Sequence, residues 1–450
     1  MTDLTRIEDL ERCFRKYPDV PEEVIIKEDC LRHGISWSAP ALEASGKAEA
    51  QTKAYFLFQF DRSSRSNMQL NETVRAPEEI KIHGGEYKLK DTVIADHLSA
   101  DSPYLVDMID GRMQLCDRSD GNLKPITEVK VRIPPRYYHK TLPSGTPYWE
   151  IGAATMWAWN IFITVLRNCQ HWGPKEECKF CDLNANLREL KKLGRVYVVE
   201  KSLEEVSTVI AEAFADYRGD PPTEAEEFES VMERGPHRVL FSGGTITTQI
   251  HGKRDADFYI PYVEAARSLI GGRFDITLQS TAYDKEDCRL ISKAGATSHC
   301  ANFEVWDERL FAIICPGKNR VYGRDTWIKR LLDSVDVFGE GNVFPGFVAG
   351  VEMAKPWGFE KVEDAVKSTT NGMEYLMSHG VIPRPITWCV EPLSALRDQS
   401  IVQLDYLIEI DRNWYELWTK YGLPIPSREP IGTGRGRYPN GAYCDMGPHE

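Results

Sequence analysis

The chain has 450 residues, 42% of them hydrophobic and 27% charged, which is typical of a globular protein able to bury a substantial core. Its formal net charge of -13 at pH 7 disfavours nucleic acid as a partner, because phosphate binding needs clustered Lys and Arg. No run of about eighteen apolar residues is present, and the polar start of the sequence lacks the apolar core of a secretory signal. We therefore expect no membrane span and a cytoplasmic protein.

The first 150 residues divide into two segments of different character. Residues 1–75 are predicted to form a helical and loop-rich extension, in which the polar stretch 43–54 indicates a solvated helix or a linker. Residues 76–150 contain short alternating apolar runs separated by Gly, Asp and Ser, a pattern that predicts strands and turns. We therefore expect a small β-rich N-terminal domain over 76–150.

From about residue 155, apolar runs of strand length alternate with amphipathic stretches of helical period. Six such repeats predict a parallel sheet covered by helices, either an open doubly wound sheet or an incomplete β/α barrel. In both folds, ligands bind at the carboxyl ends of the strands. The repeat region is expected to end near residue 392 and to be followed by a C-terminal helix and a Gly-rich tail over 393–450. The strands are predicted at 161–166, 238–243, 274–280, 296–306, 342–352 and 381–388.

One short segment concentrates three of the eleven cysteines. Cys169, Cys178 and Cys181 form a Cys-x8-Cys-x2-Cys pattern directly after the first strand of the repeat region. In a reducing compartment such a group indicates a metal site, and thiolates suit iron–sulfur clusters or zinc. Three thiolates can bind three irons of a cubane cluster and leave the fourth iron open for a chelating ligand. A structural zinc site, with His171 as fourth ligand, and a chance grouping of inert thiols are the alternatives.

This loop resembles that of the radical S-adenosylmethionine (SAM) superfamily, whose usual pattern is Cys-x3-Cys-x2-Cys with an aromatic residue before the last cysteine. Phe180 is that aromatic residue here, whereas the first gap has eight residues instead of three. The resemblance covers roughly 155–390, and the stretch from NFEVW to GVE is most similar to the biotin-synthase-like branch. It implies an incomplete (βα)6 TIM-like barrel, an α/β fold, carrying a small β-containing N-terminal domain. It also implies a [4Fe-4S] cluster on the three cysteines and SAM on the open iron.

Further residues match the SAM-binding motifs of that superfamily. Gly243, Gly244 and Thr245 end the second strand, where these enzymes hold the amino group of SAM through backbone carbonyls; Thr245 stands where an acid is usual. Asn302 and Glu304 follow the fourth strand and have the character to bind the ribose hydroxyls or the methionyl group. The resemblance therefore assigns all five residues to SAM binding.

The fifth strand resembles the motif whose apolar residue packs on adenine. Val348 is that apolar residue, and Glu352 is the acid of the motif, one residue early against the family pattern. No second Cys-x2-Cys pair is present, so we expect no auxiliary cluster. Candidates for substrate contact, each near a predicted strand end or loop, are Gln279, Tyr283, His299, Lys318, Trp388 and Glu391.

The function that the resemblance implies is reductive cleavage of SAM to a 5′-deoxyadenosyl radical, which abstracts hydrogen from a small-molecule substrate. It implies as partners that substrate and an electron donor such as flavodoxin or ferredoxin. We expect the N-terminal β segment and the tail to close the lateral opening of the barrel. The alternatives are a zinc-stabilised binding protein without catalysis and a radical SAM enzyme that modifies nucleic acid.

Overall fold

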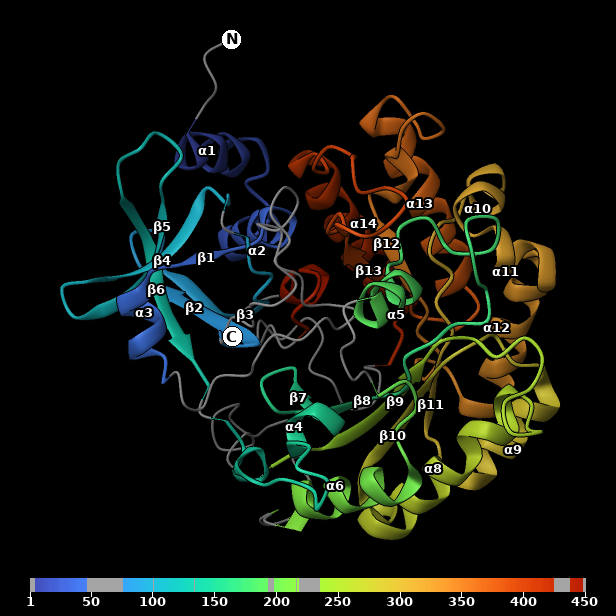
Figure 1. The fold of residues 1–450 in the computed structure, drawn as a ribbon. Helices are drawn as coiled ribbons and strands as arrows, with labels where there is room; N and C mark the ends of the chain where they lie inside the picture. Colours follow the sequence, from blue (N-terminus) through green and yellow to red (C-terminus); the bar gives the residue numbers. More distant parts are fainter. Residues whose placement is uncertain are drawn as a thin grey trace.

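The fold is mixed α/β, with a six-stranded sheet near the N-terminus and a larger region of parallel strands and helices beside it (Figure 1). Part of the polar stretch 43–54 and the Gly-rich part of the tail lie outside the described residues. None of the helices in the described part of the chain has both the length and the hydropathy needed to cross a membrane. The computed structural model describes residues 5–46, 76–99, 101–132, 134–192, 198–215, 217, 235–424 and 438–447.

The N-terminal sheet has the strand order β1-β4-β5-β6-β2-β3, and all its neighbours are antiparallel except β1 and β4. Asp110 and Gly111 join β4 to β5 with φ of 49° and 78°, as a two-residue type I′ turn requires. Its first strand comes from the segment expected to hold only helices and loops. The strands are β1 (Ser36–Trp37), β2 (Glu79–Gly84), β3 (Leu89–Ala95), β4 (Tyr104–Ile109), β5 (Arg112–Asp117) and β6 (Lys124–Val131).

Helix α2 (Glu22–His33) lies between this sheet and the C-terminal part of the chain, packing on β3 and on α14 (Leu404–Tyr421). Ten of its twelve residues are buried, charged ones included, so this helix has no solvent face. Two of its buried charged groups have partners in the C-terminal tail: Lys27 Nζ lies 2.7 Å from Asp445 Oδ2, and Glu28 accepts from the backbone N–H of Ala442. The described part of the tail is therefore anchored on α2. The other helices of this part are α1 (Arg6–Lys16) and α3 (Ala39–Ala44).

The larger region has parallel strands in sequential order. Strands β8 to β11 form one sheet with β7 antiparallel at its edge, and β12 and β13 form a separate parallel pair. Isolated parallel bridges, His299 with Val343 and Glu304 with Phe347, join the two sheets, so closure into an incomplete barrel stays a prediction. The strands are β7 (Ala153–Thr155), β8 (Asn160–Leu166), β9 (Arg238–Gly243), β10 (Asp275–Gln279), β11 (Ser298–Cys300), β12 (Gly346–Ala349) and β13 (Arg384–Thr387).

Each of the six predicted strand positions holds a strand, but the fourth and fifth are much shorter than the predicted 296–306 and 342–352. The chain leaves the extended conformation after β11, and Glu304 has a φ of 77°, which a β-strand does not accommodate. The apolar residues of this stretch are buried in packing instead: Phe303 stacks on Phe347 with ring centroids 5.6 Å apart. The sequence of this stretch therefore predicted burial correctly and strand length wrongly.

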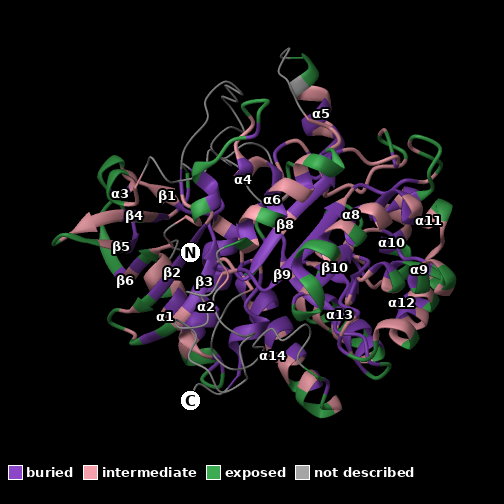
Figure 2. Ribbon diagram, turned by 90° about the horizontal axis from the view of Figure 1, so that it is seen from below, coloured by how far each residue is buried: buried purple, intermediate pink, exposed green. Residues whose placement is uncertain are grey.

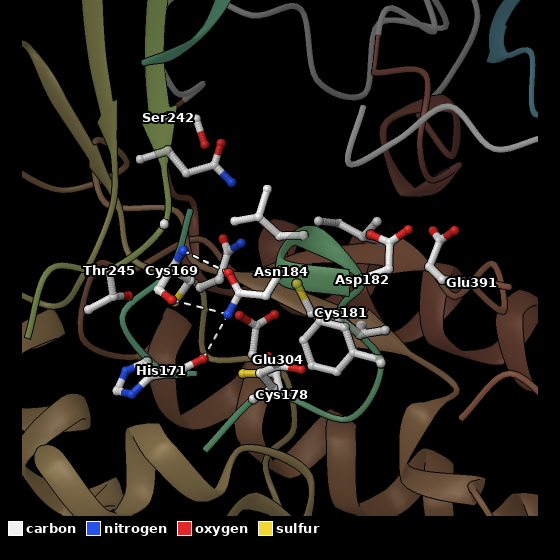
Figure 3. Close-up of a pocket in the computed structure, with 18 of the residues that line it drawn as sticks. Cys169, His171, Cys178, Cys181, Asp182, Asn184, Ser242, Thr245, Glu304 and Glu391 are labelled. Carbon is white, nitrogen blue, oxygen red and sulfur yellow. Dashed lines mark hydrogen bonds between the residues drawn. The ribbon is translucent and has the colours of Figure 1, made fainter. Parts of the chain in front are cut away.

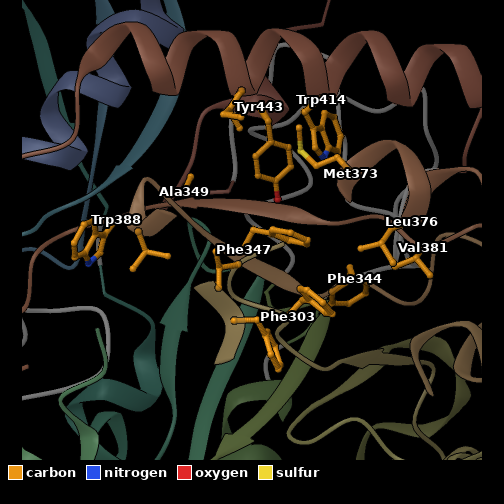
Figure 4. Close-up of a cluster of buried hydrophobic side chains, with 14 of the residues drawn as sticks. Phe303, Phe344, Phe347, Ala349, Met373, Leu376, Val381, Trp388, Trp414 and Tyr443 are labelled. Carbon is orange, nitrogen blue, oxygen red and sulfur yellow. The ribbon is translucent and has the colours of Figure 1, made fainter. Parts of the chain in front are cut away.

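Helices cover the strands on their outer side, and the strands β8, β9 and β10 are buried beneath them (Figure 2). A second layer forms where α13 and α14 pack over β12 and β13, around Phe347, Met373 and Trp414 (Figure 4). Short turns complete the region, at α4 (Tyr148–Ile151), η2 (Arg136–His139), η3 (Gly271–Arg273), η4 (Val351–Met353) and η6 (Tyr443–Asp445). The longer helices are α5 (Leu183–Lys192), α6 (Leu203–Ala215), α8 (Asp255–Ile270), α9 (Lys285–Ala294), α10 (Glu308–Ile314), α11 (Pro316–Val321), α12 (Arg324–Phe338) and α13 (Val362–Met377).

The N-terminal sheet is fastened to the larger region at the turn between β7 and β8. Met156, Trp157 and Ala158 all have positive φ, of 57°, 57° and 70°, which is unfavourable for residues with a Cβ. The carboxylate of Glu79 on β2 accepts hydrogen bonds from the backbone N–H groups of Met156 and Trp157, at 2.6 and 2.7 Å. Contacts from the N-terminal sheet thus hold a strained turn of the larger region in place.

Candidate functional site

A cavity of ≈ 190 Å³ lies at the carboxyl ends of the parallel strands, and we call it the cysteine cavity. It is lined by residues that follow β8, end β9 and β10, follow β11, belong to β12 and follow β13. Ten of the eleven residues predicted to bind metal or SAM line it (Figure 3). They are Cys169, Cys178, Phe180, Cys181, Gly243, Gly244, Thr245, Asn302, Glu304 and Val348.

The cysteine loop is held in shape by Asn184, near the start of α5. Its Oδ1 accepts from the backbone N–H of Cys169 at 2.9 Å, while its Nδ2 donates to the carbonyls of Cys169 and His171 at 3.1 and 2.9 Å. These bonds appear as dashed lines in Figure 3. At the other end of the loop, the backbone N–H of Cys181 donates to the carbonyl of Cys178. Asn184 therefore ties the start of the cysteine loop, at Cys169 and His171, to the first turn of α5, which follows the last cysteine.

The middle of the loop rests on α11. Gly317 donates its backbone N–H to the carbonyl of Glu176, and Arg320 binds the Glu176 carboxylate with Nε to Oε1 at 2.7 Å. A Cβ on Gly317 would lie 2.4 Å from the Glu176 carbonyl and 2.5 Å from Nδ1 of His171. Glycine is required at this position because the loop passes so close to the helix backbone.

The end of β9 passes just as closely beside the first cysteine. A Cβ on Gly244 would lie 2.2 Å from the carbonyl oxygen of Asn168 and 2.6 Å from Cα of Cys169, and a Cβ on Gly243 would meet the hydroxyl of Tyr259. The carbonyl of Thr245 already accepts the backbone N–H of Gln170. A carbonyl oxygen has two lone pairs, so the Thr245 carbonyl can accept a second hydrogen bond. The turn can therefore still bind a ligand through its backbone carbonyls, as predicted.

The three thiols differ in their electrostatic surroundings. Burial raises the pKa of Cys169 to about 11 and raises that of Cys181 well above its usual value. Contact with the thiol of Cys315 lowers the pKa of Cys178, and the nearby charge of Lys318 acts in the same direction. A bound metal would favour the thiolate form of all three, because a coordinating thiol is deprotonated.

The fit of these residues to a metal group depends on the kind of group. Among the described residues, no three side chains of His, Cys, Asp or Glu are arranged so that they could hold one metal ion. In a cubane cluster each thiolate binds a different iron, so the ligands surround a cluster and not a single ion. Three cysteines on one loop, facing one cavity, match that donor set. His171, the predicted fourth ligand of a zinc site, lines the same cavity, and burial lowers its pKa to about 4.

A buried ion pair lies in the wall of the cavity. Lys318 Nζ is 2.5 Å from Oε1 of Glu304 and donates to the carbonyl of Asn302 at 3.0 Å. Burial acts to lower the pKa of Lys318, but Glu304 and the Cys178 and Cys315 sulfurs together outweigh burial and raise the pKa above the usual value. The Oδ1 atom of Asn302 accepts from the backbone N–H of Gly346, which fixes this side chain to β12.

Several predicted residues lie elsewhere. Glu352 does not line the cavity: its carboxylate accepts from Thr369 Oγ1 at 2.5 Å, from the Tyr406 hydroxyl and from the Gly350 backbone, between α13 and α14. It therefore fastens helices behind β12. Of the substrate candidates, Tyr283 and His299 are buried away from the cavity, bonded to Asp255 and to Ser334 respectively. Those that line it are Gln279, Lys318, Trp388 and Glu391.

The cavity also contains residues that the sequence analysis did not select. His97, which follows β3, and Asn440 of the tail line it, and Asn440 accepts from Thr387 through its carbonyl. The N-terminal sheet and the tail therefore both reach the carboxyl ends of the strands, where we expected them to close the site. Nothing local in the sequence marks His97 or Asn440, whereas Asn184 stands only three residues after the last cysteine.

No family model matches this sequence, and no curated protein matches it either. Among solved structures, the chain is similar to methylornithine synthase (PylB), with 16% identity over 57% of this chain and 62% of that one and a TM-score of 0.40. It is also similar to the FeFe-hydrogenase maturase HydG from Carboxydothermus hydrogenoformans, with 14% identity over 64% and 56% of the two chains and a TM-score of 0.38.

A third structure is coproporphyrinogen III oxidase (HemN) from Escherichia coli, described as a radical SAM enzyme, with 10% identity, coverage of 42% and 41%, and a TM-score of 0.31. The matched regions span about half the length of these structures. Likenesses with such TM-scores carry no argument about function, so the proposal below depends on the residues of the chain itself.

Proposed function

We propose that this chain is a radical SAM enzyme that acts on a small molecule, with a [4Fe-4S] cluster held by Cys169, Cys178 and Cys181. The observation that carries the proposal is their common cavity: three cysteines of one loop line it together with the Gly243–Gly244 turn, at the carboxyl ends of parallel strands. Ligands bind at these ends in β/α folds. We infer further that β8 to β13 form an incomplete (βα)6 barrel.

When bound, the cluster and SAM would supply a 5′-deoxyadenosyl radical, which removes a hydrogen atom from the substrate. The residues of the chain would position and protect these partners. Asn184 fixes the cysteine loop, and the Gly243–Gly244 turn lets β9 approach it closely. Asn302, Glu304 and Val348 line the part of the cavity where the resemblance places SAM.

The remaining lining residues would exclude water, because a reactive radical must be protected from side reactions. His97 and Asn440 cover the cavity from two segments distant in the sequence. In the wall of the cavity, the charges of Glu304 and Lys318 neutralise each other. The proposal also requires an external electron donor, for which reduced flavodoxin or ferredoxin is suited.

The test is anaerobic reconstitution of the purified chain with iron and sulfide, followed by metal analysis and incubation with SAM and dithionite. The proposal predicts about four irons per chain and release of 5′-deoxyadenosine. The variants Cys169→Ala, Cys178→Ala and Cys181→Ala should each lose both, whereas Cys116→Ala, at a buried cysteine in the N-terminal sheet, should keep both. A colourless protein that retains zinc would contradict the proposal.

A further inference from the structure

A second cavity, of ≈ 110 Å³, adjoins the cysteine cavity; we call it the arginine cavity. It shares four lining residues with the cysteine cavity, namely Gln279, Asn302, Ile386 and Asn440. Its walls are formed by alternate residues of the parallel strands, which point to the same side of a strand. They include Asn160, Phe162 and Thr164 of β8, Arg238 and Leu240 of β9, and Arg384 and Ile386 of β13.

Two arginines face this cavity from the first positions of β9 and β13. Arg238 is 1% exposed and Arg384 is 5% exposed, although arginine is seldom buried to this degree. A buried guanidinium stays charged, because its pKa lies too high for it to lose the proton. Each of them brings a fixed positive charge to the wall of an enclosed space.

Both guanidinium groups are held in defined orientations. Arg238 donates from Nε to Oδ1 of Asn160 at 3.1 Å and contacts the sulfur of Met156 through Nη2. The guanidinium of Arg384 lies 3.8 Å from the ring centroid of Phe344. Stacking fixes the plane of a guanidinium and leaves its N–H groups in that plane, the geometry that binds a carboxylate through two parallel hydrogen bonds.

The two charges act on the same part of the wall. Burial raises the pKa of the Cys300 thiol to about 12, while Arg384 and Arg238 both act to lower it. Cys300 lines the arginine cavity at the end of β11, so both guanidinium groups are close enough to this cavity to act electrostatically on a side chain in its wall.

The cavity is also lined by three acidic residues and by Lys201. Glu78 and Glu79 come from the N-terminal sheet segment and Glu150 from α4. The carboxylate of Glu79 is engaged by the backbone N–H groups of the turn between β7 and β8. The arginines thus come from strands β9 and β13, and the acids come from the N-terminal sheet segment and from α4.

We propose that the substrate of the radical reaction carries a carboxylate, which Arg238 and Arg384 bind in the arginine cavity, while the rest of the molecule extends past Gln279 and Asn302 toward the cysteine cavity. The proposal rests on the proposed function, since it names the substrate class of the same site. The small volume of the arginine cavity suits an acid of few atoms and not a polymer.

The first experiment measures binding without radical chemistry. Thermal unfolding of the full chain is followed with butyrate and succinate, with their neutral amides butyramide and succinamide, and with methyl phosphate. At saturation a carboxylate should raise the unfolding midpoint by about 2 °C, and its amide should not. Arg238→Gln and Arg384→Gln should abolish the shift, the Lys variants should keep part of it, and Arg289→Gln, on the surface of α9, should leave it unchanged.

Equal shifts with carboxylates and amides, or unchanged shifts in both Gln variants, would overturn the proposal. A shift with methyl phosphate alone would replace the carboxylate by a phosphate and would overturn it as well. If a Gln variant does not fold, the Lys variants decide: a carboxylate shift equal to that of the wild type in both Lys variants would contradict binding by the two guanidinium groups and would overturn the proposal.

The second experiment links the site to the reaction. A metabolite extract is divided by ion exchange into anionic, neutral and cationic fractions, and each is added to the reconstituted enzyme with SAM and reductant. The anionic fraction, or a fraction that contains zwitterionic amino acids, should stimulate 5′-deoxyadenosine release, and Arg384→Gln should lower this stimulation at least tenfold. Arg289→Gln, on the surface of α9, should keep both the stimulated and the unstimulated rate within twofold of the wild type. The active fraction is then resolved into single compounds, because an amino acid elutes with the neutral or cationic fraction although it carries a carboxylate. Stimulation only by compounds without a carboxylate would overturn the proposal. If wild-type enzyme forms no 5′-deoxyadenosine at all, the proposed function fails, and the thermal measurement still decides on the carboxylate site.

Discussion

Lys318 and Glu304 form a buried ion pair, 2.5 Å from Nζ to Oε1, in the wall of the cavity that the three cysteines line. The pair joins α11, which supports the cysteine loop, to the segment after β11, which adjoins β12. A single pair of charges thus connects the proposed cluster loop with the strand ends on the opposite wall.

The first prediction concerns this pair. Lys318→Met should destabilise the chain by about 3–5 kcal/mol, because it leaves the carboxylate of Glu304 buried without its partner charge. The double variant Lys318→Met/Glu304→Leu should be more stable than Lys318→Met, since neither charge remains. Urea unfolding of the metal-free protein measures both. A double variant as unstable as the sum of the two single variants would show that the two residues do not interact.

The second prediction concerns the shape of the cysteine loop. Asn184→Ala removes three hydrogen bonds to the loop, worth about 1 kcal/mol each, so iron bound after reconstitution should fall several-fold. Asn184→Asp keeps an acceptor for the backbone N–H of Cys169, so the iron that it binds should lie between the amounts bound by the wild type and by Asn184→Ala. The matched control is Asn413→Ala on α14, which loses one bond to Thr370 and should bind iron like the wild type. Full iron binding by Asn184→Ala would contradict a role of this side chain in positioning the loop.

The third prediction tests the close approach of β9 to the loop. Gly244→Ala places a methyl group 2.2 Å from a backbone oxygen, which only a backbone shift can relieve, so we expect a loss of stability of about 1–3 kcal/mol and loss of iron. Gly272→Ala serves as control, because a Cβ there meets no atom within 4 Å. Its stability should stay within about 0.5 kcal/mol of the wild type. Iron analysis and thermal unfolding of the two variants give the comparison.

The fourth prediction is a dependence of stability on pH. Asp405 of α14 binds Arg12 at 3.0 Å and the Tyr17 hydroxyl at 2.9 Å. Burial acts to raise its pKa, but these partners and Lys16 outweigh burial and lower it to about 2. A carboxyl with a lowered pKa stabilises the folded state above its unfolded pKa, and this stabilisation disappears as pH falls toward the folded value.

Asp405→Asn should therefore cost about 1–2 kcal/mol at pH 7, after allowance for solvent screening, and progressively less between pH 4 and 2. Denaturant unfolding of both proteins at several pH values measures the difference. Asp19→Asn, which removes an exposed partner of Arg412, is the control and should change stability by less than about 1 kcal/mol. A constant difference between wild type and Asp405→Asn from pH 7 to pH 2 would contradict the prediction.

The sequence by itself determined the elements and the chemical character of the site. Strand positions follow from local apolar runs, and the cysteine pattern indicates a metal-binding loop through spacing alone, since both depend on residues close together in the chain. The length of β11 was not determined in this way, because the apolar residues that follow Cys300 fill a core although the chain is no longer a strand there.

Only the tertiary structure decided which side chains face the two cavities. Glu352, one residue from its place in the motif, turns toward Tyr406, while His97 and Asn440 reach the cysteine cavity from opposite ends of the sequence. In the sequence, nothing distinguishes Arg238 and Arg384 from other strand residues. In the structure, the parallel strands place both in the wall of one cavity. The reason is physical: a periodic pattern records which face of an element is apolar, whereas the partner of that face depends on packing between segments hundreds of residues apart.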